Sequence, residues 1–478
     1  METTLLWHDY ETWGVNPRSD RACQFAAIRT DTDLNVVDEP VMLYCRPTAD
    51  FLPNPGSAMI TGITPQQMTE KGVNEAEFFA VIHEQFSRPG TCGVGYNSLR
   101  FDDEVTRFGF YRNYFEPYAR EWQNGNSRWD ILDLVRMTHA LRPGGINWWE
   151  REPGIPGFRL DQLTIANGIS HEDAHDALAD VHATIEMARL IRKHQPRLYD
   201  YYFELRNKRK VAQLLDLAKQ EMVLHITGMY PSTLGCIAPV IPLIQHPINK
   251  NAIVVYDLRH SPEKLLQLPA DEIQRLLYTP KDELAEGEER PPLKTVQINK
   301  SPALAPLSTL SDEMAERWII DLDSAAQYRR QLLDDHNIVA TLTGVFQQRK
   351  EFEQQDVDTA LYEGFLNNRD TGLSEQVRKS SPQQLAGWQP GFTDKRLQKL
   401  YFRYRARNWP ESLTDDEQQR WREFCDARNL RGEKGASLTL DAYRELIAEL
   451  RTGELTEEKQ HILNEMEQWP EAIGVSND

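Results

Sequence analysis

The order of strand-like and helix-like patterns before residue 192 limits the fold more than any other feature of this chain. Strand-like runs stand at Leu5–Tyr10, Cys23–Arg29, Val41–Cys45 and Cys92–Tyr96. Helical spacing of apolar residues stands at Asn74–Phe86, Asp103–Tyr114, Ile131–Leu141, Leu160–Asn167 and Asp176–Arg192. Three consecutive strands followed by mixed helices and strands predict an α/β domain, a central mixed sheet with helices packed on it.

The pattern changes after residue 222. Short strand-like runs at Met222–Met229, Ile237–Ile244, Ile253–Leu258 and Thr295–Ile298 are separated by Pro, Gly, Asn and His. They predict a small, mostly β domain, with an acidic, solvated loop at 281–290. Helical spacing returns beyond residue 355. We therefore predict three domains, at 1–192, 193–352 and 353–478.

Composition and charge set limits on location and partners. The 478 residues carry a formal net charge of −19, from 73 acidic and 54 basic residues, which taken alone argues against a nucleic-acid partner. The five cysteines are far apart in the chain, which favours a reducing cytoplasm over a disulfide framework. No signal peptide and no apolar run long enough to span a membrane is recognisable.

A pair of carboxylates lies at the end of the first predicted strand, in His8-Asp9-Tyr10-Glu11-Thr12. Residues two apart in a strand point to the same face, so Asp9 and Glu11 project side by side. Neighbouring carboxylates repel unless a cation lies between them, and hard oxygen ligands suit Mg²⁺ or Mn²⁺. The alternative for this common pattern is a solvent-facing pair on an edge strand.

Two further motifs add acidic groups and a histidine. Asp102 and Asp103 stand where a predicted strand enters a helix, so either can cap the helix while the other coordinates a metal. His175 precedes Asp180 by five residues at the start of the last helix of this region. A histidine there is a candidate general base, although a structural role is the commoner one.

In this order, Asp9, Glu11, Asp102, His175 and Asp180 resemble the active-site set of the DEDDh 3′→5′ exonucleases. More narrowly, the chain resembles the bacterial exonuclease I family of single-strand-specific deoxyribonucleases. The stretch 60–64 is similar to a segment typical of the DEDDh superfamily. The stretches that carry the narrower resemblance are 8–12, 101–107, 126–130, 141–148, 158–160, 166–169, 195–198, 298–300 and 404–408.

The resemblance implies a ribonuclease-H-like exonuclease domain, an SH3-like β-barrel and a helical C-terminal domain. It implies two Mg²⁺ ions, with Mn²⁺ as a substitute, bridged by Asp9 and held further by Glu11, Asp180 and Asp102. His175 would take the proton of the attacking water. The implied activity is 3′→5′ hydrolysis of single-stranded DNA to 5′-mononucleotides, in DNA repair and recombination.

The resemblance also implies contacts with partners. The residues that it assigns to DNA are Glu11, Arg107, Arg136, Arg159, Lys208 and Lys300. Arg142 and Tyr201 match positions that help bind the acidic C-terminal tail of the single-stranded-DNA-binding protein. A strand path built from one chain needs no second copy, so we expect a monomer without a membrane partner.

Two alternatives remain, an RNA-directed DEDDh exonuclease and a non-catalytic nucleic-acid-binding scaffold on the same fold. The large C-terminal half argues against the first, and the complete active-site set against the second. The acidic net charge also hides local basic segments. Residues 189–212 hold eight basic and two acidic residues, and residues 395–407 hold six basic and no acidic ones. We therefore predict a positively charged path for the DNA strand within an otherwise negatively charged protein surface.

Overall fold

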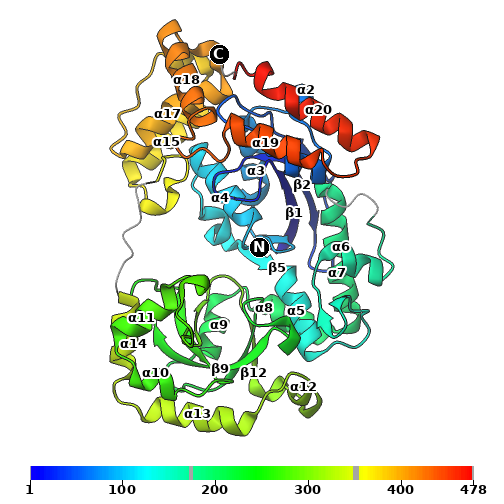
Figure 1. The fold of residues 1–478 in the computed structure, drawn as a ribbon, viewed down its shortest axis with the longest axis vertical. Coiled ribbons are helices and arrows are strands. Elements are labelled where there is room, and N and C mark those ends of the chain that lie inside the picture. Colours follow the sequence, from blue (N-terminus) through cyan, green and yellow to red (C-terminus); the bar gives the residue numbers. More distant parts are fainter. Residues whose placement is uncertain (1, 172–175, 348–354, 476–478) are drawn as a thin grey trace. The chain divides into compact units, whose positions relative to one another are not determined.

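The computed structural model describes residues 2–171, 176–347 and 355–475. They form two compact units (Figure 1). The first unit contains residues 1–127, 171–185 and 352–478, and the second contains residues 128–170 and 186–351. The first unit therefore joins the N-terminal and C-terminal parts of the chain.

A mixed sheet forms the centre of the first unit. Its strands are β1 (Thr4–Thr12), β2 (Ala22–Thr30), β3 (Val41–Tyr44) and β4 (Thr91–Gly95), hydrogen-bonded in the order β3-β2-β1-β4. The β1–β2 and β2–β3 pairs are antiparallel, and the β1–β4 pair is parallel. This confirms the predicted mixed sheet. Every residue of β2 is buried, as expected for an interior strand covered on both faces.

Helices from both ends of the chain surround this sheet. Asn74 caps α3 by accepting from the backbone N–H of Glu77, and α17 ends at Asn408, two residues before Pro410. The sequence reading missed the short helices α1 and α2, each of which begins at a proline. The helices of this unit are α1 (Pro55–Thr61), α2 (Pro65–Lys71), α3 (Glu75–Ser87), α4 (Asp102–Arg112), the start of α7 (Ala177–His194), α15 (Asn368–Lys379), α16 (Pro382–Ala386), α17 (Lys395–Asn408), α18 (Asp415–Asn429), α19 (Leu440–Leu450) and α20 (Glu457–Ala472).

The C-terminal helices share hydrophobic cores with the N-terminal segment. Phe108 and Tyr111 of α4 pack in one cluster with Leu400 and Tyr404 of α17. Helices α19 and α20 lie beside α1 and α2 (Figure 1), where Ala58 packs with residues that include Tyr443 and Trp469. The C-terminal helices are therefore part of the body that holds the central sheet.

A buried network of ion pairs joins the same segments. The guanidinium of Arg407 on α17 donates to Asp50, at 2.7 Å, and to Asp358. Arg21 and Arg112 both donate to the carboxylate of Glu75, the first residue of α3. The members of this network, which we call the arginine network, are Arg21, Arg112, Arg403, Arg407 and Arg428 with Asp50, Glu75, Asp356 and Asp358.

The arginine network corrects one expectation from the sequence. Arg403, Arg405 and Arg407 belong to the basic segment 395–407 and are each less than 8% exposed. Arg403 and Arg407 pair within the network, and Arg405 pairs with Glu417. These three of the six cations are neutralised inside the protein, so this part of the predicted positive path for the DNA strand is wrong, whereas Lys395 and Lys399 of the same segment are exposed.

The second unit is built on an antiparallel sheet. Its strands are β8 (Val223–Ile226), β9 (Ile237–Gln245), β10 (Ala252–Asp257), β11 (Leu293–Gln297) and β12 (Ala303–Pro306), in the order β11-β10-β9-β8-β12. Four of them match predicted runs. This unit also contains β6 (Glu150–Glu152), β7 (Ile155–Pro156), α5 (Ile131–Leu141), α6 (Leu160–Ala166), α8 (Pro196–Glu204) and α9 (Lys208–Leu214), and all of β5 (Ser127–Asp130) except its first residue.

The expectation of a mostly β region between 222 and 352 is wrong in part, because five helices lie there. They are α10 (Glu263–Gln267), α11 (Ala270–Tyr278), α12 (Asp312–Arg317), α13 (Leu322–Asp334) and α14 (Ile338–Gln347). Ile273, Leu332 and Leu342 from three of these helices pack with Val254 and Tyr256 of β10. Helices α10, α11, α13 and α14 supply about half of the buried residues of this cluster, and such packing is the main source of stability for helices of this length.

All five cysteines are free and buried in the structure. Within the described ranges, the structure contains no helix with the length and apolar character that crossing a bilayer requires.

We predict that Arg407→Ala lowers the free energy of unfolding by about 3–5 kcal/mol, because it leaves Asp50 and Asp358 buried with fewer counter-charges. Asp50 is fully buried, and the pKa of its carboxyl lies well below its usual range because Arg407 and Arg21 outweigh the effect of burial. Urea denaturation measures the change. Arg451→Ala, which breaks an exposed pair with Glu467, is the control and should change stability by less than about 1 kcal/mol. Equal effects of the two variants would contradict the role given to the network.

Candidate active site

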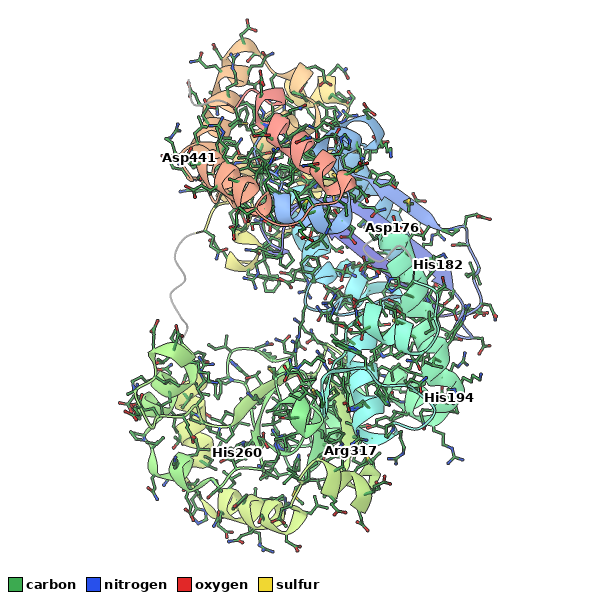
Figure 2. The ribbon with its side chains drawn as sticks, turned by 45° about the vertical axis from the view of Figure 1, so that its right-hand side comes forward. Asp176, His182, His194, His260, Arg317 and Asp441 are labelled. Carbon is green, nitrogen blue, oxygen red and sulfur yellow. The ribbon has the colours of Figure 1, made fainter. Side chains whose placement is uncertain are left out.

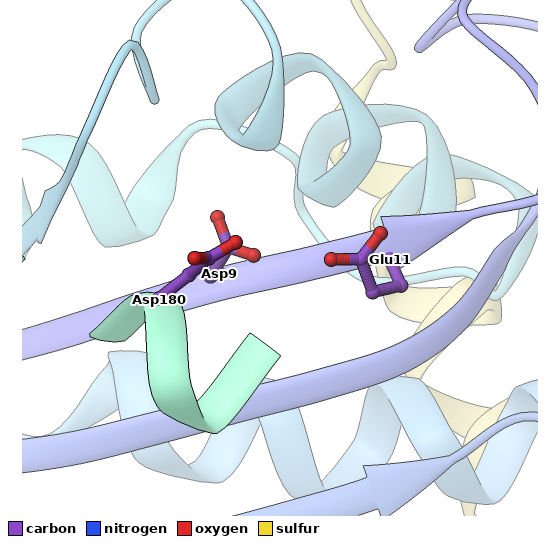
Figure 3. Close-up of side chains that lie close together, drawn as sticks. All are labelled: Asp9, Glu11 and Asp180. Carbon is purple, nitrogen blue, oxygen red and sulfur yellow. The ribbon is translucent and has the colours of Figure 1, made fainter. Parts of the chain in front are cut away.

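Three carboxylates meet at the end of β1. Asp9 and Glu11 project from this strand, and Asp180 projects from the first turn of α7 (Figure 3). One oxygen from each side chain lies within 4.8 Å of the others. The structure therefore confirms that Asp9 and Glu11 share a face, and it brings Asp180 to them across 169 residues of sequence.

Asp102 reaches the same place from another element. It is the first residue of α4, and its Oδ1 accepts a hydrogen bond of 3.2 Å from the backbone N–H of Tyr10, between Asp9 and Glu11. The hydroxyls of Tyr10 and Thr106 lie 3.0 Å apart, and this contact ties β1 to α4 a second time. Asp102 is 3% exposed, and its charge raises the pKa of both Asp9 and Glu11, although it lies outside the group of three acids whose oxygens are within 4.8 Å of one another.

Neither Asp102 nor Asp103 caps α4. The N-cap residue is Phe101, which makes no side-chain cap, so the capping alternative considered for the two aspartates is wrong. Asp103 instead forms a buried pair of 2.5 Å with Arg120. The two adjacent acids bind different partners because successive side chains of a helix point in directions about 100° apart.

The electrostatics of the cluster are unfavourable without a cation. Burial, with the charges of Asp102, Glu11 and Asp180 adding to it, raises the pKa of Asp9 well above its ordinary value. Burial and the charges of Asp180 and Asp102 raise the pKa of Glu11 to about 9. Carboxylates held this close favour the bound form of a divalent cation, whose charge offsets their repulsion. The donor set, all oxygen, fits Mg²⁺ or Mn²⁺.

The start of α7 is organised around Asp176 and Asp180. Asp176 accepts from the backbone N–H groups of Leu178 and Ala179 and lies beside the strands of the sheet (Figure 2). His171 Nε2 lies 2.5 Å from Asp180 Oδ1. The predicted general base, His175, lies outside the described residues.

Gln24 on β2 holds α7 to the sheet, a role that sequence reasoning missed. Its Nε2 donates to Asp176 Oδ2 at 2.9 Å, and its Oε1 accepts from the N–H of Ala177 at 3.3 Å. Gln24 is 1% exposed and pairs directly with Glu11 across the two strands. The available signal was a glutamine within the otherwise apolar strand ACQFAAI, because a buried amide needs polar partners.

The candidate DNA contacts differ in how accessible they are. Arg159 is 66% exposed and pairs with Asp161, and Lys208 is exposed at the first position of α9. Arg136 is 14% exposed and pairs with Asp133, and Lys300 is partly exposed in the turn that follows β11. Arg107 is 7% exposed because Glu104 and Glu121 bind its guanidinium from two sides.

Arg142 and Tyr201, the two candidate partner contacts, line one cavity in the second unit. The cavity has a volume of about 630 Å³. Arg142 donates to the carbonyl of Thr309 at 3.1 Å, and the hydroxyl of Tyr201 donates to that of Leu304 at 3.0 Å. Its lining residues are Arg142, Gln195, Pro196, Arg197, Leu198, Tyr201, Pro306 and Thr309.

Comparison with known proteins shows the family. Family models match residues 6–188 (Exonuclease), 206–348 (Exonuclease I SH3-like domain) and 355–473 (Exonuclease I C-terminal domain). Exodeoxyribonuclease I of Escherichia coli K12 is 47% identical over 424 residues, which cover 88% of this chain and 89% of that protein. The chain belongs to the exonuclease I family. Its SH3-like and helical C-terminal domains confirm the predicted fold class.

Solved structures agree with this assignment over the whole chain. Exonuclease I from Methylocaldum szegediense has a TM-score of 0.94 at 46% identity and covers 98% of this chain and 99% of its own. E. coli exonuclease I in complex with a dA16 oligonucleotide has a TM-score of 0.93 at 43% identity and covers 99% of this chain and 100% of its own. In contrast, oligoribonuclease of Thiobacillus denitrificans is 27% identical, and the match covers 40% of this chain and 94% of that protein.

We predict that Gln24→Leu weakens divalent-cation binding and lowers kcat by about 10- to 100-fold, as loss of a residue that orients metal ligands does. The variant keeps the side-chain volume but leaves Asp176 and the start of α7 without their tie to β2. Isothermal titration with Mn²⁺ and a nuclease assay measure the two effects. Gln297→Leu on β11 is the matched control and should change neither. Unchanged Mn²⁺ affinity in Gln24→Leu would contradict the positioning role.

Proposed function

We propose that this chain is a metal-dependent exodeoxyribonuclease that degrades single-stranded DNA in the 3′→5′ direction and releases 5′-mononucleotides, in DNA repair and recombination. The observation that carries the proposal is the convergence of Asp9, Glu11 and Asp180. Asp102 adds a fourth carboxylate at the same point, held against Tyr10. This arrangement supports two-metal hydrolysis of phosphodiesters, which uses clustered carboxylates as ligands.

The carboxylates have distinct positions in this proposal. Asp9, Glu11, Asp180 and Asp102 would together hold two Mg²⁺ ions. When bound, such ions would activate a water for attack and offset the negative charge that develops on the leaving 3′ oxygen. A zinc-bound form of the E. coli exonuclease I complex with single-stranded DNA has been solved, which supports a divalent metal in the family.

The remaining groups position and transfer protons. We assign the role of general base to His175, whose ordinary pKa near 6.5 suits proton transfer at neutral pH. The backbone N–H of Tyr10 on β1 holds Asp102, and the amide of Gln24 on β2 holds the start of α7. The ligands are thereby oriented before substrate arrives, so less reorganisation is needed during the reaction.

DNA is favoured over RNA as the substrate because the exodeoxyribonuclease I relatives match a larger share of the chain than the oligoribonuclease relatives do. Oligoribonuclease relatives match about two fifths of the chain, whereas exodeoxyribonuclease I relatives match nearly nine tenths. We propose that the chain comprises an exonuclease domain at 1–192, an SH3-like domain at 193–352 and a helical domain at 353–478. A scaffold without activity has no need of four carboxylates whose repulsion opposes folding.

We propose Glu11 and the accessible cations as substrate contacts. Arg159 and Lys208 are exposed, and Lys300 is partly exposed, so each can reach a phosphate. The segment 189–212, with its excess of six basic charges, adds to the attraction of a polyanion. Arg136 contributes from a partly buried position beside Asp133. The buried Arg107 acts indirectly, through the residues that it holds.

We predict that Asp9→Ala and Asp180→Ala abolish digestion of 3′-end-labelled single-stranded DNA and leave the fold intact. Removal of one carboxylate relieves repulsion, so both variants should melt at or above the wild-type temperature in EDTA. The wild type should gain thermal stability on addition of Mg²⁺, and the variants should gain less. The assay compares single-stranded DNA, duplex DNA and RNA, with and without EDTA. Digestion by either variant at the wild-type rate contradicts the site, and preference for RNA supports the alternative enzyme.

The cavity around Arg142 and Tyr201 supports a second proposal, binding of the acidic C-terminal tail of the single-stranded-DNA-binding protein. The guanidinium groups of Arg142 and Arg197 suit carboxylates, and Leu198, Pro196 and Pro306 suit an apolar side chain. We further propose that the protein acts as a monomer in the cytoplasm, where its five free cysteines stay reduced.

We predict that Arg142→Ala weakens binding of a fluorescent peptide with that tail sequence by about tenfold or more, as loss of a charged anchor does. Tyr201→Ala should weaken it by a smaller factor, because it removes ring contacts only. Fluorescence anisotropy measures the affinities. Arg151→Ala, which removes an exposed arginine of β6 in the same unit, should have no effect. Equal binding by Arg142→Ala and wild type would exclude this cavity as the tail site.

A further inference from the structure

An exposed phenylalanine lies next to a half-exposed tyrosine in the first unit. Phe365 is 91% exposed and Tyr362 is 47% exposed. The ring of Tyr118, from the segment that follows α4, lies 6.2 Å from the ring of Phe365. We call these three residues the aromatic shelf. Isolated apolar side chains on a surface need no explanation, but a group of aromatic rings drawn from two distant segments does.

The backbone of the aromatic shelf is held firmly, so the exposure of Phe365 does not come from a loose loop. Arg396 on α17 donates to the carbonyl of Ala360 at 2.6 Å and to that of Gly364 at 2.9 Å. Leu361 and Leu366, on either side of the exposed rings, pack in the core cluster with α17. The side chain of Phe365 is therefore held in a solvent-exposed position, although Leu361 and Leu366 of the same loop pack in the core.

Arg107 and Glu104 set the position of the rings. The hydroxyl of Tyr362 donates to Glu104 at 2.7 Å and accepts from Arg107 at 3.2 Å. The Arg107 guanidinium also lies 5.5 Å from the centre of the Tyr118 ring. Glu104 is two residues from Asp102 in the first turn of α4. The aromatic shelf is thus tied to the same turn of helix that supplies a carboxylate to the active site.

A cation completes the surface. Arg18, in the loop between β1 and β2, lies with its guanidinium 5.3 Å from the centre of the Tyr362 ring. Its side chain is 52% exposed, and its Nε lies 3.6 Å from the carboxylate of Glu104, which leaves the terminal nitrogens for a phosphate. Exposed aromatic faces beside an arginine are the chemistry that binds unpaired bases and their phosphates. The exposed residues Glu363 and Gly364 separate Tyr362 from Phe365 in the sequence, and the charge of Glu363 disfavours the apolar centre of a protein interface here.

We propose that the aromatic shelf stacks an unpaired base of single-stranded DNA and that Arg107 is its positioning residue. Arg18 contacts the adjacent phosphate. This inference rests on the proposed function, since it assigns a base-stacking subsite to the same substrate. Stacking on an aromatic face does not depend on base identity, so the subsite suits an enzyme that degrades any sequence.

The test measures binding in EDTA, where hydrolysis is stopped. Phe365→Ala should weaken binding of a single-stranded oligonucleotide by about tenfold, within the range measured for loss of one base-stacking aromatic. Phe365→Trp should retain wild-type affinity. Phe365→Leu, which keeps an apolar side chain without a ring, should lose most of it. Tyr278→Ala removes an aromatic side chain of exposure similar to Tyr362 at the end of α11 and should bind as wild type does.

A set of oligonucleotides with one abasic site, moved stepwise from the 3′ end, locates the stacked base. The wild type should lose affinity at one position, and Phe365→Ala should lose no further affinity there. A purely structural role of Phe365 would lower affinity without such a position, and that result overturns the proposal. Wild-type affinity in Phe365→Ala overturns the proposal too. So does wild-type affinity in Phe365→Leu, because it would show that an apolar side chain without a ring is sufficient for DNA binding. The Mg²⁺-dependent digestion of DNA by the wild type separately tests the proposed function.

Discussion

The buried ion pairs of the arginine network hold together the helices of the first unit. Glu75 begins α3 and binds Arg112 at the end of α4, while Asp50 and Asp358 bind Arg407 on α17. Because α4 is held at its end by this network, its first residue, Asp102, meets β1 at Tyr10. The C-terminal helices thus take part in placing an active-site carboxylate that precedes them by about 300 residues.

The same kind of buried acid behaves in opposite ways in the network and in the active site. Burial alone raises the pKa of Glu75, but Arg112 and Arg21 outweigh it and lower that pKa to about 2. Glu11 is surrounded by other carboxylates instead, and burial and its neighbours raise its pKa to about 9. The protein pairs the first set of acids with its own arginines, whereas the second set has mainly other carboxylates as charged neighbours. In the proposed function, stability and metal binding therefore depend on separate groups of acids within one unit.

The spacing of apolar residues predicted a helix or strand well where that element's own sequence carries the pattern. The helix expected at Ile131–Leu141 has those bounds, and the three N-terminal strands agree within two residues. The prediction failed for α10 to α14, which are short and take their stability from the sheet that they cover. The predicted positive surface at residues 395–407 failed for Arg403 and Arg407, because a local count of charges does not include their distant partners Asp50, Asp356 and Asp358. Gln24 was missed for a similar reason, since its partners lie 152 residues away.

The sequence by itself determined the chemistry of this protein. The spacing of Asp9 and Glu11 places both on one face of a strand, and the order of the acidic motifs indicates the family. Only the tertiary structure decided which acids are ligands and which are counter-ions. Asp102 faces β1 while its neighbour Asp103 pairs with Arg120. The physical reason is that the charge state of a buried carboxylate depends on the groups that surround it in space, and those groups come from distant parts of the chain.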